Sequence, residues 1–270
     1  MKLVVKDLEF SYPGVPVLRD ISFEFRPGET VSIVGENGAG KSTLLKCMNR
    51  ILSYKQGTVM VEGNDITDMK RKEIALYMAY LPQKTSYLYP ITVFDAVLTG
   101  RFRHLSMETG RTSEGIVWDI LDMMGLEHIA MRDFNEISGG QQQQVIIARA
   151  LAQEADILLL DEPTAGLDIR HQLEVMDVIQ HSVREKDLLA AITLHDLNLA
   201  ARYSDRVIML HQGRIFAAGE PLAVFTPEHI SAVYGVKASV SHANGSPVII
   251  PHSTADAADE QNCGEAEAEA

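Results

Sequence analysis

The sequence has few of the residues that secreted and membrane-spanning proteins need. Its 270 residues include two cysteines, Cys47 and Cys263, which are too few for a disulfide framework and lack metal-ligand spacing. The longest apolar runs, 157–160 and 188–192, are far shorter than the roughly 20 residues of a membrane-spanning helix. The first ten residues contain no apolar signal-peptide region. We therefore expect a soluble protein from a reducing, cytoplasmic compartment.

Positive charge is also scarce. The chain carries 24 Lys and Arg against 37 Asp and Glu, a formal net charge of −13, and no Lys or Arg follows Lys237. Non-specific binding to nucleic acid needs basic side chains that displace counterions from phosphates, so no nucleic-acid partner is expected. Residues 253–270 are rich in Ala, Asp and Glu without a core-forming pattern, which predicts an acidic, disordered tail.

The rest of the chain predicts an α/β fold. Alternating residues in 3–10 and 17–25, joined by a turn at 12–14, predict an antiparallel pair of strands. Apolar runs of buried-strand length alternate with helical patterns, which predicts a mostly parallel sheet covered on both faces. The runs are 30–34, 156–160 and 189–194, and the helical patterns are 42–50, 141–152, 171–185 and 197–203.

Two segments interrupt or extend this fold. Helical spacing without a convincing strand predicts a helical subdomain inserted at about 85–150. Strand patterns at 236–240 and 248–250, on either side of Asn244-Gly245, predict a small C-terminal hairpin, and we place the extension beyond the main domain at 241–252. The predicted organisation is thus a main domain of residues 1–240 that contains the insertion, then the hairpin extension, then the tail 253–270.

A glycine-rich segment joins the strand at 30–34 to the following helix. Residues 35–42 fit G-x-x-x-x-G-K-[ST]. The glycines let successive backbone N–H groups point inward at an anion, and the helix adds the positive end of its dipole. Lys41 would reach the β- and γ-phosphates, and the Ser42 hydroxyl can ligate Mg²⁺. The expected nucleotide contacts are Gly35, Glu36, Asn37, Gly38, Ala39, Gly40, Lys41, Ser42 and Thr43.

Two adjacent carboxylates end the apolar strand at 156–160. Asp161 and Glu162 would stand at the carboxyl edge of the sheet, where ligands of doubly wound folds bind. Beside a phosphate loop, we expect Asp161 to hold Mg²⁺ and Glu162 to orient and polarise the attacking water as a general base. Together, the two motifs predict a P-loop NTPase.

Residues 137–141 indicate which kind of P-loop NTPase this is. Their sequence, Ile-Ser-Gly-Gly-Gln, matches the signature L-S-G-G-Q with Ile for Leu, about twenty residues before Asp161. On these motifs, residues 1–240 resemble the ATP-binding subunit of ABC transporters. The resemblance implies a P-loop NTPase core with a mixed sheet, an N-terminal antiparallel β-subdomain and a helical subdomain. It also implies that four signature residues face the γ-phosphate of the ATP bound by a second copy of the chain: Ser138, Gly139, Gly140 and Gln141.

The resemblance implies roles at four further positions. Gln83 would sense Mg²⁺ and the γ-phosphate, and His195 would contact the γ-phosphate. Tyr12 would stack on adenine, although a turn tyrosine that covers the core is the alternative. Asp168 would lie in a loop that crosses the dimer interface. The implied cofactors are ATP and Mg²⁺, with catalysis by Lys41, Glu162 and His195 and metal contacts from Ser42, Gln83 and Asp161.

One phosphate loop and one signature per chain imply a homodimer with two ATP sites at its interface. The resemblance further implies ATP hydrolysis that drives integral-membrane permease subunits from the cytoplasmic face of the cell membrane. An extracytoplasmic solute-binding protein would be an indirect partner.

The cargo is indicated only by subfamily resemblance. Residues 168–176, 195–206 and 226–236 are similar to importer subunits for iron–siderophore, haem and vitamin B12 complexes. Importers of molybdate or tungstate, zinc, or cobalt are alternatives, as are an exporter subunit and a soluble, non-transport ABC ATPase. Residues 87–91, Tyr-Leu-Tyr-Pro-Ile, predict an apolar outer loop, which we interpret as a groove for a permease helix or as local packing of the insertion.

Overall fold

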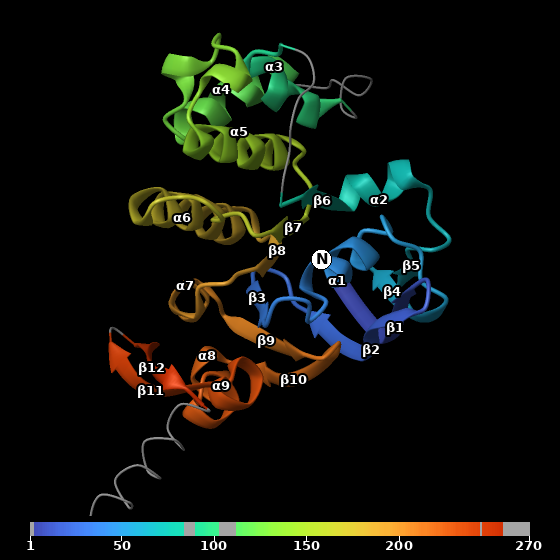
Figure 1. Ribbon diagram of the computed structural model, residues 1–270. Coiled ribbons are helices and arrows are strands. Elements are labelled where there is room, and N and C mark those ends of the chain that lie inside the picture. The colour runs from blue at the N-terminus through green and yellow to red at the C-terminus, as the bar shows by residue number, and fades with distance from the viewer. Residues whose placement is uncertain (1–2, 84–89, 103–111, 244, 256–270) are drawn as a thin grey trace, which may run out of the picture.

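Figure 1 shows the computed structural model, which describes residues 3–83, 90–102, 112–243 and 245–255. In these residues the strands form a six-stranded, a four-stranded and a two-stranded sheet. A group of helices, coloured green, lies at the opposite end of the molecule from the red C-terminal strands.

The six-stranded sheet forms the centre of the molecule. Its strands lie in the order β10, β9, β3, β8, β7, β6. They span, in that order, Arg214–Gly219, Arg206–His211, Thr30–Gly35, Leu189–Thr193, Ile157–Asp161 and Met78–Leu81. Neighbours from β9 to β6 are parallel, and β10 is antiparallel to β9. The sheet is therefore mixed, as predicted.

Alternate residues of the buried strands pack into different cores. Every residue of β3, β7 and β8 is buried. In β7, Ile157 and Leu159 join one hydrophobic cluster, while Leu158 and Leu160 join the other. A strand that is covered on both faces needs a continuous apolar run, which is why 157–160 contains no polar residue.

The four-stranded antiparallel sheet packs against one of these cores. Its order is β2, β1, β4, β5, with bounds Val15–Phe25, Leu3–Tyr12, Gln56–Val61 and Asn64–Asp65. Leu8 and Ile21, from β1 and β2, share a hydrophobic cluster with Leu44 and Leu45 of α1, Lys41–Met48. The predicted antiparallel pair at the N-terminus is confirmed. Helix α2, Arg71–Tyr77, precedes β6.

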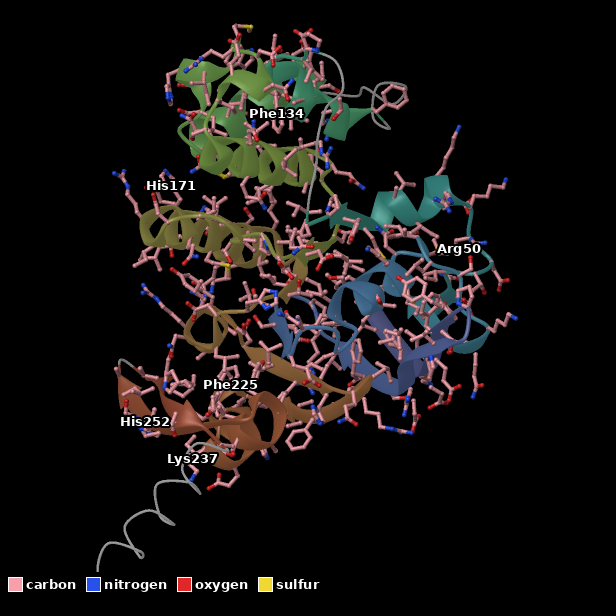
Figure 2. The ribbon with its side chains drawn as sticks, in the orientation of Figure 1. Arg50, Phe134, His171, Phe225, Lys237 and His252 are labelled. Atoms are coloured by element: carbon pink, nitrogen blue, oxygen red, sulfur yellow. The ribbon has the colours of Figure 1, made fainter. Side chains whose placement is uncertain are left out.

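Helices follow β6 in the described part of 90–152. They are α3, Val93–Leu98, α4, Ser113–Met123, and α5, Gly139–Ala152, with three short 3₁₀ turns at 99–101, 127–129 and 134–136. Phe134 is buried among them (Figure 2). Of the predicted docking loop 87–91, residues 87–89 lie outside the described residues, as do residues 256–270 of the predicted tail.

Two helices cover the side of the sheet that faces this group. Helix α6, Ile169–Lys186, lies next to α5 in Figure 1, and α7, Leu197–Tyr203, follows β8. Both contribute to the cluster that contains Leu158 and Leu160. Among the helices formed by the described residues, none has the length and apolar character needed to cross a bilayer.

The C-terminal hairpin is longer than the predicted 241–252. After α8, Pro221–Val224, and α9, Pro227–Tyr234, strand β11 spans Val236–Ala243 and pairs with β12, Ser246–Thr254. The predicted strands at 236–240 and 248–250 are confirmed, but the hairpin starts inside the predicted main domain and ends inside the segment predicted as tail. Polar residues of β12 pair through their backbone with the start of β11, a contact that side-chain pattern does not reveal. Phe225 is buried between α8 and α9 (Figure 2).

Candidate functional site

The loop between β3 and α1 needs glycine for its conformation. Gly35, Gly38 and Gly40 have φ values of 146°, 84° and 104°, a region that L side chains rarely adopt. A Cβ at Gly35 would lie 2.2 Å from the Leu210 carbonyl oxygen, and one at Gly40 would lie 2.8 Å from Leu18 Cδ2. The curl of the predicted phosphate loop therefore depends on the absence of side chains at these positions.

Lys41 is held inside this loop. Its Nζ donates hydrogen bonds to the carbonyl oxygens of Gly35 at 2.8 Å and Glu36 at 3.0 Å. Burial lowers the pKa of Lys41, and the nearby carboxylates of Glu162 and Asp161 partly offset this effect. The ammonium group is thus poorly solvated, and the nearby carboxylates favour its charged form while they partly cancel its attraction for an anionic ligand.

Asp161 is a buried carboxylate surrounded by hydroxyl groups. Its Oδ1 accepts hydrogen bonds from Ser42 Oγ and Thr193 Oγ1, each at 2.8 Å. Its Oδ2 accepts one from the Tyr80 hydroxyl at 3.3 Å, and burial together with this carboxylate raises the pKa of Tyr80. Hydroxyl and carboxylate oxygens are the ligand types that Mg²⁺ prefers, so the donor set fits the predicted metal.

Glu162 is held by partners from two other strands. Its Oε1 lies 2.6 Å from His195 Nε2, and its Oε2 accepts a hydrogen bond from Gln83 Nε2 at 2.5 Å. Gln83, Glu162 and His195 follow β6, β7 and β8, three neighbouring parallel strands, so the sheet brings their side chains to one edge. The backbone of Glu162 has φ 52°, a conformation that non-glycine residues adopt at a cost and that clusters at functional sites.

Lys41, Ser42, Glu162 and His195 line one cavity. Its volume is about 300 Å³, and its lining includes Tyr12, Val17, Asn37, Gly38, Gly40, Lys41, Ser42, Thr43, Glu162 and His195. Tyr12 is 42% exposed, and its ring packs edge-on against Phe10 at a centroid distance of 4.9 Å. Ala39 is buried within the loop and donates its N–H to the Glu36 carbonyl at 3.2 Å.

The predicted signature residues lie at a helix N-terminus. Ser138 caps α5: its Oγ accepts from the Gln141 N–H at 3.3 Å, and Gln141 Oε1 accepts from the Ser138 N–H at 3.1 Å. Gly139 has no atom within 4 Å of the place where a Cβ would be, which leaves the front of the helix open. A Cβ on Gly140 would lie 3.7 Å from Leu167, so the segment before Asp168 runs beside this N-terminus.

Asp168 caps the next helix, α6. Its Oδ1 accepts from the His171 N–H at 2.9 Å and lies 2.7 Å from His171 Nδ1. These contacts lower the pKa of Asp168, the backbone hydrogen bond most strongly. The carboxylate therefore stays charged at the positive end of the helix dipole.

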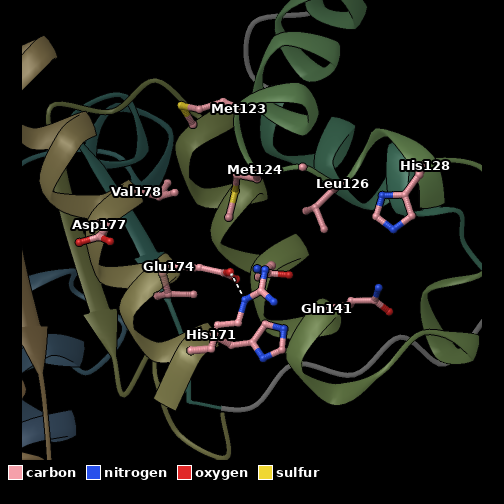
Figure 3. Close-up of a pocket in the computed structure, with 13 residues that line it drawn as sticks. Met123, Met124, Leu126, His128, Gln141, His171, Glu174, Asp177 and Val178 are labelled. Atoms are coloured by element: carbon pink, nitrogen blue, oxygen red, sulfur yellow. Dashed lines mark hydrogen bonds and ion pairs between the residues drawn. The ribbon is translucent and has the colours of Figure 1, made fainter. Parts of the chain in front are cut away.

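Figure 3 shows a second cavity, of about 480 Å³, between α4, α5 and α6. Gln141 and His171 line it, and Arg170 on its wall donates from Nε to Glu174 Oε1 at 2.8 Å. The described residues that line the phosphate-loop cavity include neither Asp168 nor any of 138–141. A single chain therefore does not bring the signature residues into the cavity that holds Lys41 and Glu162.

Sequence patterns alone missed two members of the site, Thr193 and Tyr80. Thr193 ends the apolar strand β8 and pairs in register with Asp161, and its Oγ1 also accepts the Glu162 N–H at 2.8 Å. A hydroxyl residue at the carboxyl end of a buried strand is the signal that could have found it. Tyr80 gives no such signal, because its contact depends on how β6 lies beside β7.

A curled glycine loop that precedes a helix and faces acidic groups at the carboxyl ends of parallel strands is the arrangement of a P-loop NTPase. The similarity of the whole chain to known proteins then assigns it to one family of P-loop NTPases.

The sequence profile of the ABC transporter family matches residues 18–165. An ABC transporter ATP-binding protein of Methanocaldococcus jannaschii is 48% identical over 93% of this chain and 98% of the relative. A cobalamin import ATP-binding protein of Halobacterium salinarum is 37% identical over 93% of this chain and 64% of the relative. A hemin import ATP-binding protein of Bordetella pertussis is 36% identical over 89% and 94%, respectively. The chain belongs to the ABC transporter family, as one of its ATP-binding proteins.

Solved structures agree with this assignment. An ABC transporter described as metal-chelate type, in an inward-facing conformation, has a TM-score of 0.78 at 26% identity, covering 93% of this chain and 96% of that chain. A dimeric bacterial ABC transporter cassette has a TM-score of 0.73 at 27% identity, covering 81% and 98%. The predicted fold class, a P-loop NTPase core with a mixed sheet and an antiparallel strand subdomain, is confirmed.

Proposed function

We propose that this chain is the ATP-hydrolysing subunit of an importer that carries metal chelates such as iron–siderophore, haem or cobalamin complexes. The observation that supports hydrolysis most directly is the position of Glu162, which Gln83 and His195 hold at the edge of the cavity that contains Lys41. The relatives named for cobalamin and hemin import support the cargo class.

ATP would occupy the cavity between Tyr12 and the loop 35–43. The ring of Tyr12 would stack on the adenine, a contact that depends on a flat base more than on its substituents. Backbone N–H groups of the curled loop and the N-terminus of α1 would bind the phosphates. Lys41 would exchange its hydrogen bonds to loop carbonyl groups for contacts with the β- and γ-phosphates.

Ser42, Asp161 and Gln83 would hold Mg²⁺. All three offer oxygen atoms, and the Ser42 hydroxyl and the Asp161 carboxylate already lie 2.8 Å apart. When bound, the metal would neutralise charge that develops on the phosphate oxygens.

Glu162 would orient the attacking water and accept its proton. His195 and Gln83 each occupy one of its carboxylate oxygens in the ligand-free chain, and the second lone pair of either oxygen could accept the hydrogen bond of the water. His195 and Lys41 would then donate to the γ-phosphate and stabilise its charge in a loose transition state.

A second copy of the chain would complete each site. Ser138, Gly139, Gly140, Gln141 and Asp168 lie at the N-termini of α5 and α6, apart from the cavity of their own chain. Helix N-termini bind anions, so this open surface is suited to the γ-phosphate held by a partner. The resulting homodimer would have two-fold symmetry, with ATP between its subunits.

The motion of this dimer would be passed to integral-membrane permease subunits at the cytoplasmic face of the cell membrane. A solute-binding protein outside the membrane would deliver the cargo. ATP acts here as a ligand that favours the closed dimer, and its hydrolysis shifts the population back to the open one.

The central experiment measures dimer formation and hydrolysis together. Purified wild-type chain should hydrolyse ATP, and Glu162→Gln should bind ATP without turnover and sediment as a dimer only with magnesium-ATP. Lys41→Met combined with Glu162→Gln is the control and should remain monomeric. Monomers alone in the Glu162→Gln sample would contradict the proposed mechanism. The cargo class is tested by ATPase stimulation in the permease complex by solute-binding protein loaded with a metal chelate, compared with molybdate-loaded protein.

A further inference from the structure

Asn198 joins the C-terminal hairpin to helix α7 through two hydrogen bonds. Its Oδ1 accepts from the Ile249 N–H at 2.8 Å, and its Nδ2 donates to the Ile249 carbonyl at 3.3 Å. One amide side chain thus satisfies both backbone groups of a residue in β12. Figure 1 shows the hairpin beside α7.

The first turn of α7, which Asn198 attaches to the hairpin, directly follows His195. Asp196 caps α7, with Oδ1 accepting from the N–H groups of Asn198 at 2.8 Å and Leu199 at 3.1 Å. His195 immediately precedes this cap. Any movement of the first turn of α7 is therefore transmitted directly to the backbone of His195.

Helix α7 depends on its neighbours for its position. It has seven residues, fewer than an isolated helix needs to be stable in water. Its two ends have separate anchors: Asn198 contacts the hairpin near the start, and the Tyr203 hydroxyl donates to Asp177 of α6 at 2.8 Å at the end. Loss of the first anchor would free the end next to His195 and leave the other end in place.

The hairpin is also part of the core that supports this turn. Ile249 is 6% exposed and belongs to the hydrophobic cluster that contains Leu194, Leu199 and Ala200. A two-stranded hairpin is marginally stable alone, so β11 and β12 need this packing as much as α7 does.

We propose that Asn198 is a positioning residue, through which the C-terminal hairpin holds His195 within reach of Glu162. The inference rests on the proposed hydrolytic role of Glu162 and His195. The hairpin then contributes to turnover although no residue of β11 or β12 lines the phosphate-loop cavity among the described residues.

The test compares Asn198→Ala with Tyr203→Phe in the full chain. Asn198→Ala should lower kcat for ATP about tenfold, since small misplacements of a catalytic group are costly, and should leave KM within about twofold. Tyr203→Phe removes the anchor at the far end and should leave kcat near the wild-type value. Hydrogen exchange of the backbone amides of 194–199 should accelerate in Asn198→Ala and stay unchanged in Tyr203→Phe.

A second comparison separates positioning from a general loss of structure. In a His195→Ala background, Asn198→Ala should cause no further fall in the residual kcat, because it acts through His195. An equal fall in both backgrounds, or unchanged exchange of 194–199, would overturn the proposal. Should His195→Ala leave no measurable residual rate, the exchange data decide. Failure of the proposed function itself is distinguishable, because wild-type chain would then lack ATPase activity or His195→Ala would retain full turnover.

Discussion

His195 Nε2 lies 2.6 Å from Glu162 Oε1, although 33 positions separate the two residues in the sequence. The contact exists because β7 and β8 are adjacent and parallel, so the residues that follow them meet at one edge of the sheet. The histidine is about half exposed and the glutamate side chain is 12% exposed, which places the pair between solvent and the phosphate loop.

The first prediction concerns this pair. His195→Ala should lower kcat about 100-fold, the scale of one positioned hydrogen-bond donor to developing charge, while ATP affinity changes little. Steady-state kinetics and equilibrium binding of ATP to the same preparation measure both quantities. His181→Ala, on α6, is the control and should leave kcat unchanged. Wild-type kcat in His195→Ala would remove His195 from the reaction.

The second prediction concerns the Thr193 hydroxyl, which donates to Asp161 and accepts the Glu162 N–H. Thr193→Val keeps the volume but leaves two buried polar groups without this partner, so we expect a loss of about 1–3 kcal/mol in the free energy of unfolding. The Mg²⁺ concentration for half-maximal ATPase activity should also rise. Urea denaturation and a Mg²⁺ titration test this.

Thr99→Val is the matched control for Thr193→Val. The Thr99 hydroxyl donates to the Ala96 carbonyl within a helical turn, and it has no contact with Asp161 among the contacts described. This variant should leave the Mg²⁺ requirement unchanged. An equal rise in both variants would contradict a specific role for Thr193.

The third prediction contrasts two glycines. Gly35→Ala places a Cβ 2.2 Å from the Leu210 carbonyl oxygen, so the phosphate loop must distort, with loss of both stability and ATP binding. Gly139→Ala meets open space in the first turn of a helix, where the added methyl group removes backbone freedom from the unfolded chain, so the ligand-free chain should be at least as stable as wild type. It should nevertheless lose ATPase activity, because the added methyl group would face the partner's nucleotide.

Thermal unfolding measures the stability of the two glycine variants, and ATP-binding and ATPase assays measure their function, so together they separate a distorted loop from a blocked contact with the partner. Full activity in Gly139→Ala would argue against the use of the signature by a second subunit. Normal ATP binding in Gly35→Ala would mean that the loop tolerates the distortion.

The fourth prediction concerns pH. Burial lowers the pKa of Lys41 below its ordinary value of 10.5, so between the two values the unfolded chain binds more protons than the folded one. The stability of ligand-free wild type relative to Lys41→Met should therefore rise as the pH passes through the lowered pKa, and level off above 10.5. Urea denaturation of both proteins over this range measures the difference, with Lys6→Met as a surface control. A constant or falling difference would contradict the burial effect.

Local patterns predicted the parts of this site that depend on short stretches of chain. The loop 35–42 and the pair Asp161-Glu162 are each explained by a few consecutive residues, and the structure brings them together. Tyr80 was missed because its role arises only when β6 lies beside β7, whereas Thr193 carries a local signal, a hydroxyl at the end of a buried strand, whose partner depends on β8 lying beside β7.

The hairpin illustrates the same limit in the fold. Ser253 and Thr254 of β12 are exposed and polar, so they give no hydrophobic alternation, yet their backbone pairs with the start of β11. The two-hydrogen-bond contact of Asn198 with Ile249 joins segments 51 residues apart, and no local pattern predicts such a contact.

The alternation along β7 has a chemical consequence. Successive residues of this strand point to opposite sides, so Asp161 and Glu162 begin from opposite orientations, one toward the Ser42 hydroxyl and the next, after a left-handed turn of the backbone, toward His195. Deleting a single residue anywhere in 157–160 would rotate every later side chain by half a turn. Asp161 would then move into the buried position of Leu160, and Glu162 would take the place of Asp161 beside the Ser42 hydroxyl, so no carboxylate would remain beside His195.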